Sequence, residues 1–380
     1  MRIAVLTSGG DAPGMNAAVR AVTMVTLALG HEPIGVRRGY QGLIEGRLEP
    51  LALADVGDGF RTGGTLLQSA RCRSFHDPAV RRRARGVLTD ADIGGLIVIG
   101  GNGSLTGALH LSDPAECGDW PVQVIGIPAS IDNDVALTSL SIGTDTAMNT
   151  IVEACDKISD TAGAHDRVFI VEVMGRDCGY LALTGAVASG ADMVLFPEAG
   201  RSEEELVASV VDAVIAVRAR NQTQKVIAIK AEGIETPTER LKELIDRRLR
   251  KLSAAERSAD GDGIDEADDD ELHDDVDTRV TVLGHVVRGG RPSAFDRLLG
   301  ARMGNVAVRS LIDGAHRQMV AWQPPVDAGD FGVRSTHDPY CYLMPLDVTL
   351  AATRELLGGQ SPLARWRATI FDDMQELFLL

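Results

Sequence analysis

One pattern recurs along this chain and limits its fold more than any other feature: an apolar run, a glycine-rich or polar turn, and a segment with helical periodicity. The first copy is RIAVLTS followed by GGDAPGMN, and later apolar runs with a similar ending are GGLIVIGG, VQVIGIP, RVFIVEVMG, KVIAIKAEG and RVTVLGHVV. Strands that alternate with helices form parallel sheets, and continuous apolar runs are typical of strands buried on both faces. The pattern predicts an α/β protein built on doubly wound, mainly parallel sheets.

The length of 380 residues exceeds what one hydrophobic core usually supports, so we expect two domains. The first covers residues 1–141, with a return segment at about 290–330, and the second covers residues 142–289. The second contains an acidic insertion at 258–277, which is too charged to form a core and which we expect to be disordered. Residues 340–380 form a C-terminal tail with one helical pattern, LDVTLAATRELL, and no recognisable chemistry.

Composition excludes several classes of protein. Because the net charge is −16, the basic run at residues 81–85 is interpreted as the solvated face of a helix, and no nucleic-acid partner is expected. No apolar run is long enough for a membrane span, and MRIAVLTSGG is too short an apolar start for a signal peptide. The five cysteines are scattered, which is typical of a reducing compartment and predicts neither a zinc site nor disulfides. We therefore expect a cytoplasmic protein that does not act at a membrane.

Two of the turns are suited to binding phosphate. In parallel sheets, ligands bind beyond the carboxyl ends of the strands, which is where the turns GGDAPGMN and GGNGS lie. Each turn offers backbone N–H groups and the start of a helix to an anion. Each could equally be a tight structural turn, but two in one sheet favour a polyphosphate ligand. Neither matches the P-loop or the dinucleotide fingerprint, which argues against a dehydrogenase.

The segment PASIDND adds carboxylates at the end of a third strand. In phosphoryl transfer, one carboxylate can take the proton of the attacking hydroxyl while another holds Mg²⁺ on the phosphates. Asp132 and Asp134 are the candidate pair, and the hydroxyl of Ser130 could contact the transferred group. A capped helix or an Asx-turn explains an isolated DND at least as well.

Cationic side chains near later strands could bind a second phosphate, because arginine forks match phosphate oxygens. The candidates are Arg167, Arg176, Arg279, His285 and Arg288. A surface salt bridge remains the alternative for each arginine, and a purely structural role remains the alternative for the histidine.

At this point the sequence resembles the phosphofructokinase family, which includes the bacterial ATP-dependent enzymes. The matching segments are LTSGGDAPGMNAAVR, GGTLLQSAR, GGNGS, PASIDND, HDRVFIVEVMGRDCGY, KAEG and RVTVLGHVVRGGRPSAFDR. They cover most of residues 1–310 in order, whereas the tail matches only loosely. The occurrence of IDND, MGR and LGHxxRGG in one chain is highly specific.

The resemblance implies 6-phosphofructokinase activity, in which the γ-phosphate of ATP passes to the 1-hydroxyl of fructose 6-phosphate in glycolysis. It implies Mg²⁺, near Asn102 and Asp134, and an active site in the cleft between the nucleotide-binding first domain and the sugar-phosphate-binding second domain. The nucleotide site would be formed by Gly10, Arg71, Cys72, Gly101, Asn102, Gly103 and Ser104.

The resemblance also implies catalytic and substrate-binding roles. Asp132 would be the general base, Arg176 would stabilise developing charge, and Arg71 would bridge donor and acceptor. Ser130 replaces the usual threonine beside the transferred phosphoryl group. The sugar phosphate would contact Ser130, Ile131, Asp132, Arg167, Met174, Gly175, Arg176, Glu232, Arg279, His285 and Arg288. Arg167 and Arg279 would reach in from a neighbouring subunit, which implies a homotetramer or a homodimer.

The sequence departs from the family pattern at positions that matter for metal binding and regulation. Asn102 replaces the aspartate of GGDGS that normally helps to hold Mg²⁺, so metal affinity should be lower. The effector site of the family uses basic residues, of which Arg20 remains while Met24 and Ser159 stand where arginines often occur. Regulation by ADP or phosphoenolpyruvate is therefore open.

Two alternatives to an ATP-dependent enzyme remain. Pyrophosphate-dependent relatives typically carry an aspartate after GGD and a lysine in PKTIDND, and here Gly103 and Ala129 stand at those positions. Glycine leaves room for the α-phosphate, which favours ATP. A non-catalytic sugar-phosphate sensor or regulatory subunit is the second alternative, and a retained general base argues against it.

Overall fold

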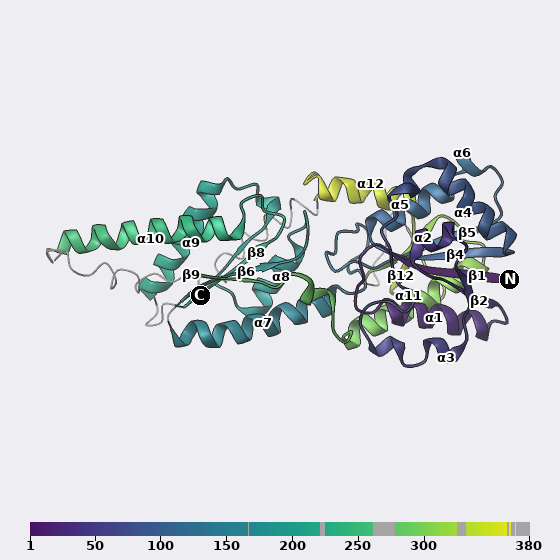
Figure 1. The fold of residues 1–380 in the computed structure, drawn as a ribbon, viewed down its shortest axis with the longest axis horizontal. Helices are drawn as coiled ribbons and strands as arrows, with labels where there is room; N and C mark the ends of the chain where they lie inside the picture. Colours follow the sequence, from purple (N-terminus) through teal and green to yellow (C-terminus); the bar gives the residue numbers. More distant parts are fainter. Residues whose placement is uncertain are drawn as a thin grey trace. The chain divides into compact units, whose positions relative to one another are not determined.

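The computed structural model describes residues 1–165, 167–220, 225–260, 278–324 and 332–362, together with residues 365 and 369. The chain divides into two compact units (Figure 1). The first contains Met1–Ala147 and Arg288–Ser361, and the second contains Met148–Val287. The division falls inside helix α7, shortly after the sequence-based boundary at 141, and the returning segment of the first unit extends to Ser361.

The first unit is built on an eight-stranded sheet in the order β11-β12-β10-β5-β4-β1-β2-β3. Its five neighbouring strands from β10 to β2 run parallel. Strand β3 pairs antiparallel with β2, β12 pairs antiparallel with β10, and β11 pairs antiparallel with β12. The strand bounds are β1 Arg2–Ser8, β2 Glu32–Val36, β3 Leu48–Pro50, β4 Ile93–Gly100, β5 Gln123–Pro128, β10 Gln318–Trp322, β11 Val333–Arg334 and β12 Cys341–Pro345.

Helices cover both faces of this sheet, as the alternation of strands and helices predicts (Figure 1). They are α1 Met15–Ala28, α2 Gly39–Ile44, α3 Leu53–Val56, α4 Pro78–Asp90, α5 Asn102–Leu111, α6 Pro114–Cys117, α11 Ala294–Ile312 and α12 Leu346–Leu357, with 3₁₀ turns η1 Gly59–Arg61 and η2 Arg73–His76. Helix α11 packs closely against the start of α1. A Cβ on Gly300 would come within 2.9 Å of the carbonyl oxygen of Gly14. One continuous core joins the strands to α2, α4, α5 and α12.

The second unit is built on a four-stranded, fully parallel sheet in the order β7-β8-β6-β9. Its strands are β6 Val168–Val173, β7 Met193–Leu195, β8 Val226–Ala231 and β9 Thr278–Val282. Its helices and turns are α7 Thr144–Ala164, α8 Tyr180–Ser189, η3 Pro197–Ala199, α9 Glu203–Arg220, α10 Thr238–Asp260 and η5 Gly284–Arg288. Every residue of β8 is buried, which is the burial expected of a strand covered on both faces. The prediction of an α/β protein with two mainly parallel sheets is thus confirmed.

Helix α10 continues through residues 258–260, which the sequence interpretation assigned to the acidic insertion. The reason is local, because ERSAD contains neither glycine nor proline and follows a segment rich in strong helix formers. Residues 261–277 lie outside the described residues.

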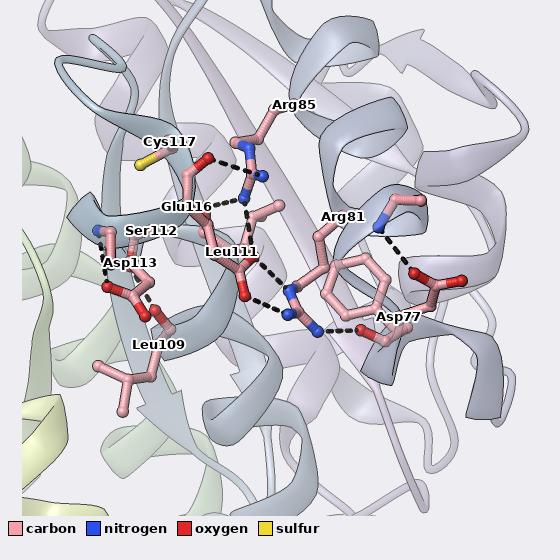
Figure 2. Close-up of polar contacts among 12 residues, drawn as sticks. Asp77, Arg81, Arg85, Leu109, Leu111, Ser112, Asp113, Glu116 and Cys117 are labelled. Carbon is pink, nitrogen blue, oxygen red and sulfur yellow. Dashed lines mark hydrogen bonds and ion pairs between the residues drawn. The ribbon is translucent and has the colours of Figure 1, made fainter.

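The interpretation of the basic run as a solvated helix face is wrong for two of its arginines (Figure 2). Arg81 and Arg85 are only 4% and 6% exposed, because their i,i+4 spacing places both on the inner face of α4. Arg81 Nε donates to Glu116 Oε2 at 2.8 Å, and Arg85 forms an ion pair with the same carboxylate at 3.5 Å. The hydrogen bonds from Arg81 lower the pKa of Glu116 below its usual value. The cluster joins α4 to α6 through paired charges.

No helix in the described part of the chain combines the length and apolar character needed to cross a bilayer.

Candidate functional site

The first glycine-rich loop joins β1 to α1 and lies close to an arginine from the returning segment. Gly9 has φ 86°, in the region that favours glycine. A Cβ on Gly10 would lie 2.6 Å from Arg288 Nη1, so this guanidinium lies directly against the backbone of the loop. Arg288 Nη1 also donates to the carbonyl oxygen of Asp11 at 3.3 Å. Arg288, which sequence reasoning assigned to the sugar phosphate, therefore contacts the loop assigned to the nucleotide.

The second glycine-rich loop lies beside the first, because β4 pairs with β1. A Cβ on Gly9 would lie 3.1 Å from Ser104 Oγ, and one on Gly100 would lie 2.5 Å from the carbonyl oxygen of Ser8. Gly101 precedes α5, and among the described residues no side chain caps the start of this helix. Its first N–H groups are thus suited to an anion. A Cβ on Gly103 would have no heavy atom within 4 Å, so the space beside it is open.

A third segment ties two further predicted residues to these loops. Ser69 Oγ donates to the carbonyl oxygen of Gly9 at 2.6 Å, two residues before the exposed Arg71. Cys72 Sγ lies 3.4 Å from Gln41 Oε1, and its side chain packs against the main core. The structure thus brings the segment that carries Arg71 and Cys72 to the first glycine-rich loop.

The PASIDND segment follows β5 and is almost entirely buried. Ile131, Asp132 and Asp134 are 0%, 3% and 7% exposed. Ser130 Oγ donates to Asp134 Oδ1 at 2.7 Å, so the hydroxyl and the carboxylate are held together. Asn133 has φ 48°, and such left-handed conformations outside glycine concentrate at functional sites.

Asp134 is the better candidate metal ligand of the two predicted. It is buried, and within the described ranges no Lys, Arg or His pairs with its carboxylate. A buried carboxylate without a cationic neighbour is suited to a bound cation. The described residues contain no group of three His, Cys, Asp or Glu that could hold a metal by itself. Asn102 begins α5 and is half-buried.

Sequence reasoning missed Asp296, which organises the chain that follows the PASIDND segment. Asp296 Oδ1 accepts from Gly143 N at 2.7 Å, and Oδ2 accepts from Thr146 N at 2.8 Å and Thr146 Oγ1 at 2.5 Å. Thr144 Oγ1, on the same turn, donates to the carbonyl oxygen of Ser130 at 2.9 Å. The only signal in the sequence was the matching segment SAFDR, which gave this aspartate no role.

The second unit holds the MGR segment in place through Glu232. Glu232 Oε1 accepts from the backbone N–H groups of Arg176 at 2.9 Å and Gly175 at 3.2 Å. Gly175 has φ 149° and Arg176 has φ 50°, so both adopt conformations unusual for side-chain-bearing residues. A Cβ on Gly233 would lie 1.8 Å from the carbonyl oxygen of Arg176, which shows how closely the two loops meet. Met174 is buried beside them, and the side chain of Arg176 is exposed.

The remaining predicted cations do not all lie at this edge of the sheet. Arg167 directly precedes β6, and Arg279 on β9 is the partner of Phe169 near the amino end of β6. Because the 6 residues of β6 separate them, Arg167 lies roughly 23 Å from Met174, at about 3.3 Å per strand residue. The exposed His285 follows β9 at the carboxyl end. Within the second unit, Arg167 and Arg279 are therefore not brought together with the MGR segment.

Comparison with known proteins identifies the family. The sequence profile described as Phosphofructokinase matches residues 2–311. The chain is 45% identical over 312 residues to the ATP-dependent 6-phosphofructokinase of Macrococcus caseolyticus, covering 82% of this chain and 86% of that protein. It is 42% identical over 322 residues to the ATP-dependent 6-phosphofructokinase of Thermotoga neapolitana, covering 85% of this chain and 90% of the relative.

Solved structures of phosphofructokinases have a fold similar to that of this chain. The phosphofructokinase of Pichia pastoris in the T-state superposes with a TM-score of 0.78 at 31% identity, covering 99% of this chain and 37% of that one. The pyrophosphate-dependent phosphofructokinase of Marinobacter aquaeolei superposes with a TM-score of 0.72 at 21% identity, covering 92% and 84%, which shows a shared fold. The matched segments, the two sheets and the extent of identity lead to one conclusion: the chain belongs to the phosphofructokinase family.

Proposed function

We propose that this chain is an ATP-dependent 6-phosphofructokinase, which transfers the γ-phosphate of ATP to the 1-hydroxyl of D-fructose 6-phosphate and releases ADP. The observation that carries the proposal is identity of 40% or more to enzymes of that name over most of the chain. The buried loop that contains Asp132 and Asp134 follows β5, and the two glycine-rich loops follow β4 and β1, the next two strands of the sheet, which supports the same chemistry.

The first unit binds the nucleotide in this proposal. The N–H groups at the start of α5 and the loop at Gly10 bind the phosphates, and Arg71 bridges donor and acceptor. Asp132 accepts the proton of the sugar 1-hydroxyl as that oxygen attacks the γ-phosphorus. Ser130, held by Asp134, donates to an oxygen of the transferred group, and the guanidinium of Arg288 adds positive charge beside the first loop.

The second unit binds the sugar phosphate. Glu232 uses Oε1 to fix the backbone of Gly175 and Arg176, which leaves Oε2 to accept from a sugar hydroxyl. The exposed guanidinium of Arg176 stabilises the charge that develops on the transferred phosphoryl group. Met174 lies beside the sugar, and His285 follows at the same edge of the sheet.

Arg167 and Arg279 complete the 6-phosphate site of a neighbouring subunit. Their position at the amino ends of β6 and β9, away from the MGR segment of the same chain, supports this assignment. A homodimer or a homotetramer is therefore part of the proposal. Its substrates are fructose 6-phosphate and ATP, without a nucleic-acid or membrane partner.

The donor set fits Mg²⁺, which would neutralise charge on the transferring phosphates. Asp134 would hold the ion with the amide oxygen of Asn102 and with phosphate oxygens. Five free cysteines in the described residues support a reducing cytoplasm as the location.

A single assay tests the proposal and separates its alternatives. Purified protein is given fructose 6-phosphate and Mg²⁺, with ATP or pyrophosphate as the sole donor. We expect ATP to support turnover, and Asp132→Asn to lower kcat by a factor of about 10²–10⁴ while sugar-phosphate binding persists. Faster turnover with pyrophosphate would favour the pyrophosphate-dependent alternative, and binding without turnover would favour the sensor.

A further inference from the structure

The loop after Asp134 is strained and needs support. Asn133 Nδ2 donates to the carbonyl oxygen of Ser139 at 3.2 Å, and Asn133 Oδ1 accepts from Ser141 N at 2.9 Å. Leu137 has φ 61°, which a bulky side chain adopts only when its surroundings hold it there. The position of the carboxylates at 132 and 134 depends on how firmly this loop is held.

Helix α12 supplies one point of support. Thr353 Oγ1 accepts from the backbone N–H of Ala136 at 3.0 Å and donates to the carbonyl oxygen of Thr349 at 2.8 Å. The Thr353 side chain is 0% exposed, so water cannot replace it as the partner of the amide. Leu346 and Leu350 fix the helix in the main core, which makes Thr353 a rigid acceptor.

The end of β10 supplies the other points of support. Gln323 Nε2 donates to the carbonyl oxygen of Leu137 at 2.8 Å. Trp322 N donates to Thr138 Oγ1 at 3.0 Å, and Ser139 N donates to the carbonyl oxygen of Trp322 at 2.8 Å. We call these contacts, together with the Thr353 contact, the loop brace. It holds residues 136–139 one by one to the part of the chain that follows α11.

We propose that Thr353 is a positioning residue for phosphoryl transfer, which acts through the Ala136 amide to hold the Asp132–Asp134 loop in its reactive geometry. The inference rests on the proposed function, and it gives the C-terminal helix a role in the chemistry. Thr353 does not touch the substrate. It acts at a distance of two residues along the backbone from Asp134, where a displacement on the order of 1 Å can cost about 100-fold in rate.

The chain offers a matched control for this test. Thr349 lies one turn earlier on α12 and is also 0% exposed, but its hydroxyl has no hydrogen-bond partner among the described residues. Thr353→Val and Thr349→Val make the same change in shape and burial. Only the first removes an acceptor from the loop brace, and Thr353→Ser restores it.

The experiment measures kcat, both KM values and the half-saturating Mg²⁺ concentration in the full-length protein, together with hydrogen exchange at Ala136. For Thr353→Val we expect kcat to fall by a factor of about 10–100, the KM for ATP to stay within twofold, and the Ala136 amide to exchange faster. Thr353→Ser and Thr349→Val should both stay close to the wild type. A role in stability alone would lower the melting temperature and leave kcat per folded molecule unchanged.

Three outcomes overturn the inference: unchanged kcat in Thr353→Val, an equal loss in Thr349→Val, or no rescue by serine. If Thr353→Val does not fold, Gln323→Met decides, because Gln323 is only partly buried and its removal should still lower kcat several-fold. An unchanged kcat there overturns the inference as well. Absence of turnover in the wild type would instead contradict the proposed function, while exchange at Ala136 still reports on the loop brace.

Discussion

At the scale of single residues, Asn102 is the position where this chain departs most clearly from the sequence pattern of its family. It begins α5, within the loop that also carries Gly101 and Gly103, and it offers an amide oxygen where a carboxylate would hold Mg²⁺ more strongly. Asp134 remains, buried and without a cationic partner among the described residues. The proposed metal site therefore depends on one carboxylate and on the phosphates of the nucleotide.

Asn102→Asp should lower the Mg²⁺ concentration that gives half-maximal rate. A second carboxylate strengthens the binding of a hard cation, and changes near a metal commonly alter affinity by about 10–100-fold. The measurement is initial rate against free Mg²⁺ at fixed ATP. Asn305→Asp, on α11 of the same unit, adds equal charge outside the loop and serves as the control. An unchanged or raised requirement would mean that the amide is the better partner of the triphosphate and that the metal assignment is wrong.

At the scale of secondary-structure elements, carboxylates join helices of the first unit that are distant in the sequence. The carboxylate of Glu116 on α6 joins two buried arginines of α4, with Arg81 also donating to the carbonyl oxygens of Phe75 at 2.9 Å and His76 at 2.7 Å (Figure 2). Asp296 at the start of α11 similarly binds the first turn of α7. Each carboxylate satisfies donors that would otherwise be buried without partners.

These long-range contacts mark the limit of what the sequence predicts. The strands and the loops at their ends could be predicted because an apolar run and the glycine turn after it are adjacent in the sequence. The partners Arg81 and Glu116 are 35 residues apart, and Gly143 and Asp296 are 153 apart, so no local pattern connects them. The interpretation of the basic run as a solvated helix face was wrong for Arg81 and Arg85 for the same reason. The sequence near an arginine does not show whether a carboxylate from a distant segment pairs with it.

Glu116→Gln should destabilise the first unit without affecting turnover of the folded protein. Loss of the carboxylate leaves two guanidiniums, each less than a tenth exposed, without the anion that pairs with both, and we expect the free energy of unfolding to fall by about 2–3 kcal/mol. Urea unfolding at pH 7 measures the change. Glu153→Gln removes the exposed pair with Lys157 and should destabilise the protein far less, because water screens that pair. Equal losses in the two variants would contradict the buried-cluster argument.

The ionisation of Asp296 should make stability depend on pH. Burial raises the pKa of Asp296 from 3.8 to about 6, although hydrogen bonds from Thr146 and Gly143 oppose the shift. The folded state thus holds a proton that the unfolded state has lost, so the stabilisation is fully present below about pH 3.8 and is lost as the pH rises through about 6. A shift of about two pKa units corresponds to on the order of 3 kcal/mol.

Comparison with Asp296→Asn isolates this contribution. The difference in unfolding free energy between wild type and variant should change by on the order of 3 kcal/mol between about pH 4 and pH 6.5, with the wild type losing stability relative to the variant. Urea titrations at several pH values measure it. A difference that does not vary with pH would show that Asp296 remains ionised throughout, so that its three donors outweigh burial.

At the scale of the whole molecule, the proposed function assigns one substrate mainly to each unit. The first contains both glycine-rich loops and the PASIDND segment, and the second contains the MGR segment held by Glu232. Each set of loops follows the carboxyl ends of strands in its own parallel sheet. One change in each unit should therefore affect one substrate and leave the binding of the other intact.

The paired test uses Gly103→Asp in the first unit and Glu232→Gln in the second. A side chain at Gly103 meets open space, and an aspartate in the first turn of α5 favours the helix, so this variant should fold normally. Its carboxylate would repel the α-phosphate, which pyrophosphate lacks. The KM for ATP should therefore rise about tenfold or more, while the KM for pyrophosphate should change less.

Glu232→Gln can still accept from Arg176 N but loses the charge that strengthens a sugar hydrogen bond, which should raise the KM for fructose 6-phosphate about tenfold. Steady-state kinetics with each substrate varied in turn measure both effects, and Gly103→Ala, which adds bulk without charge, should leave the KM for ATP nearly unchanged. If Gly103→Asp or Glu232→Gln raised the KM values for ATP and for fructose 6-phosphate equally, the division of substrates between the units would be wrong. Such a change would then act on the fold rather than on one binding site.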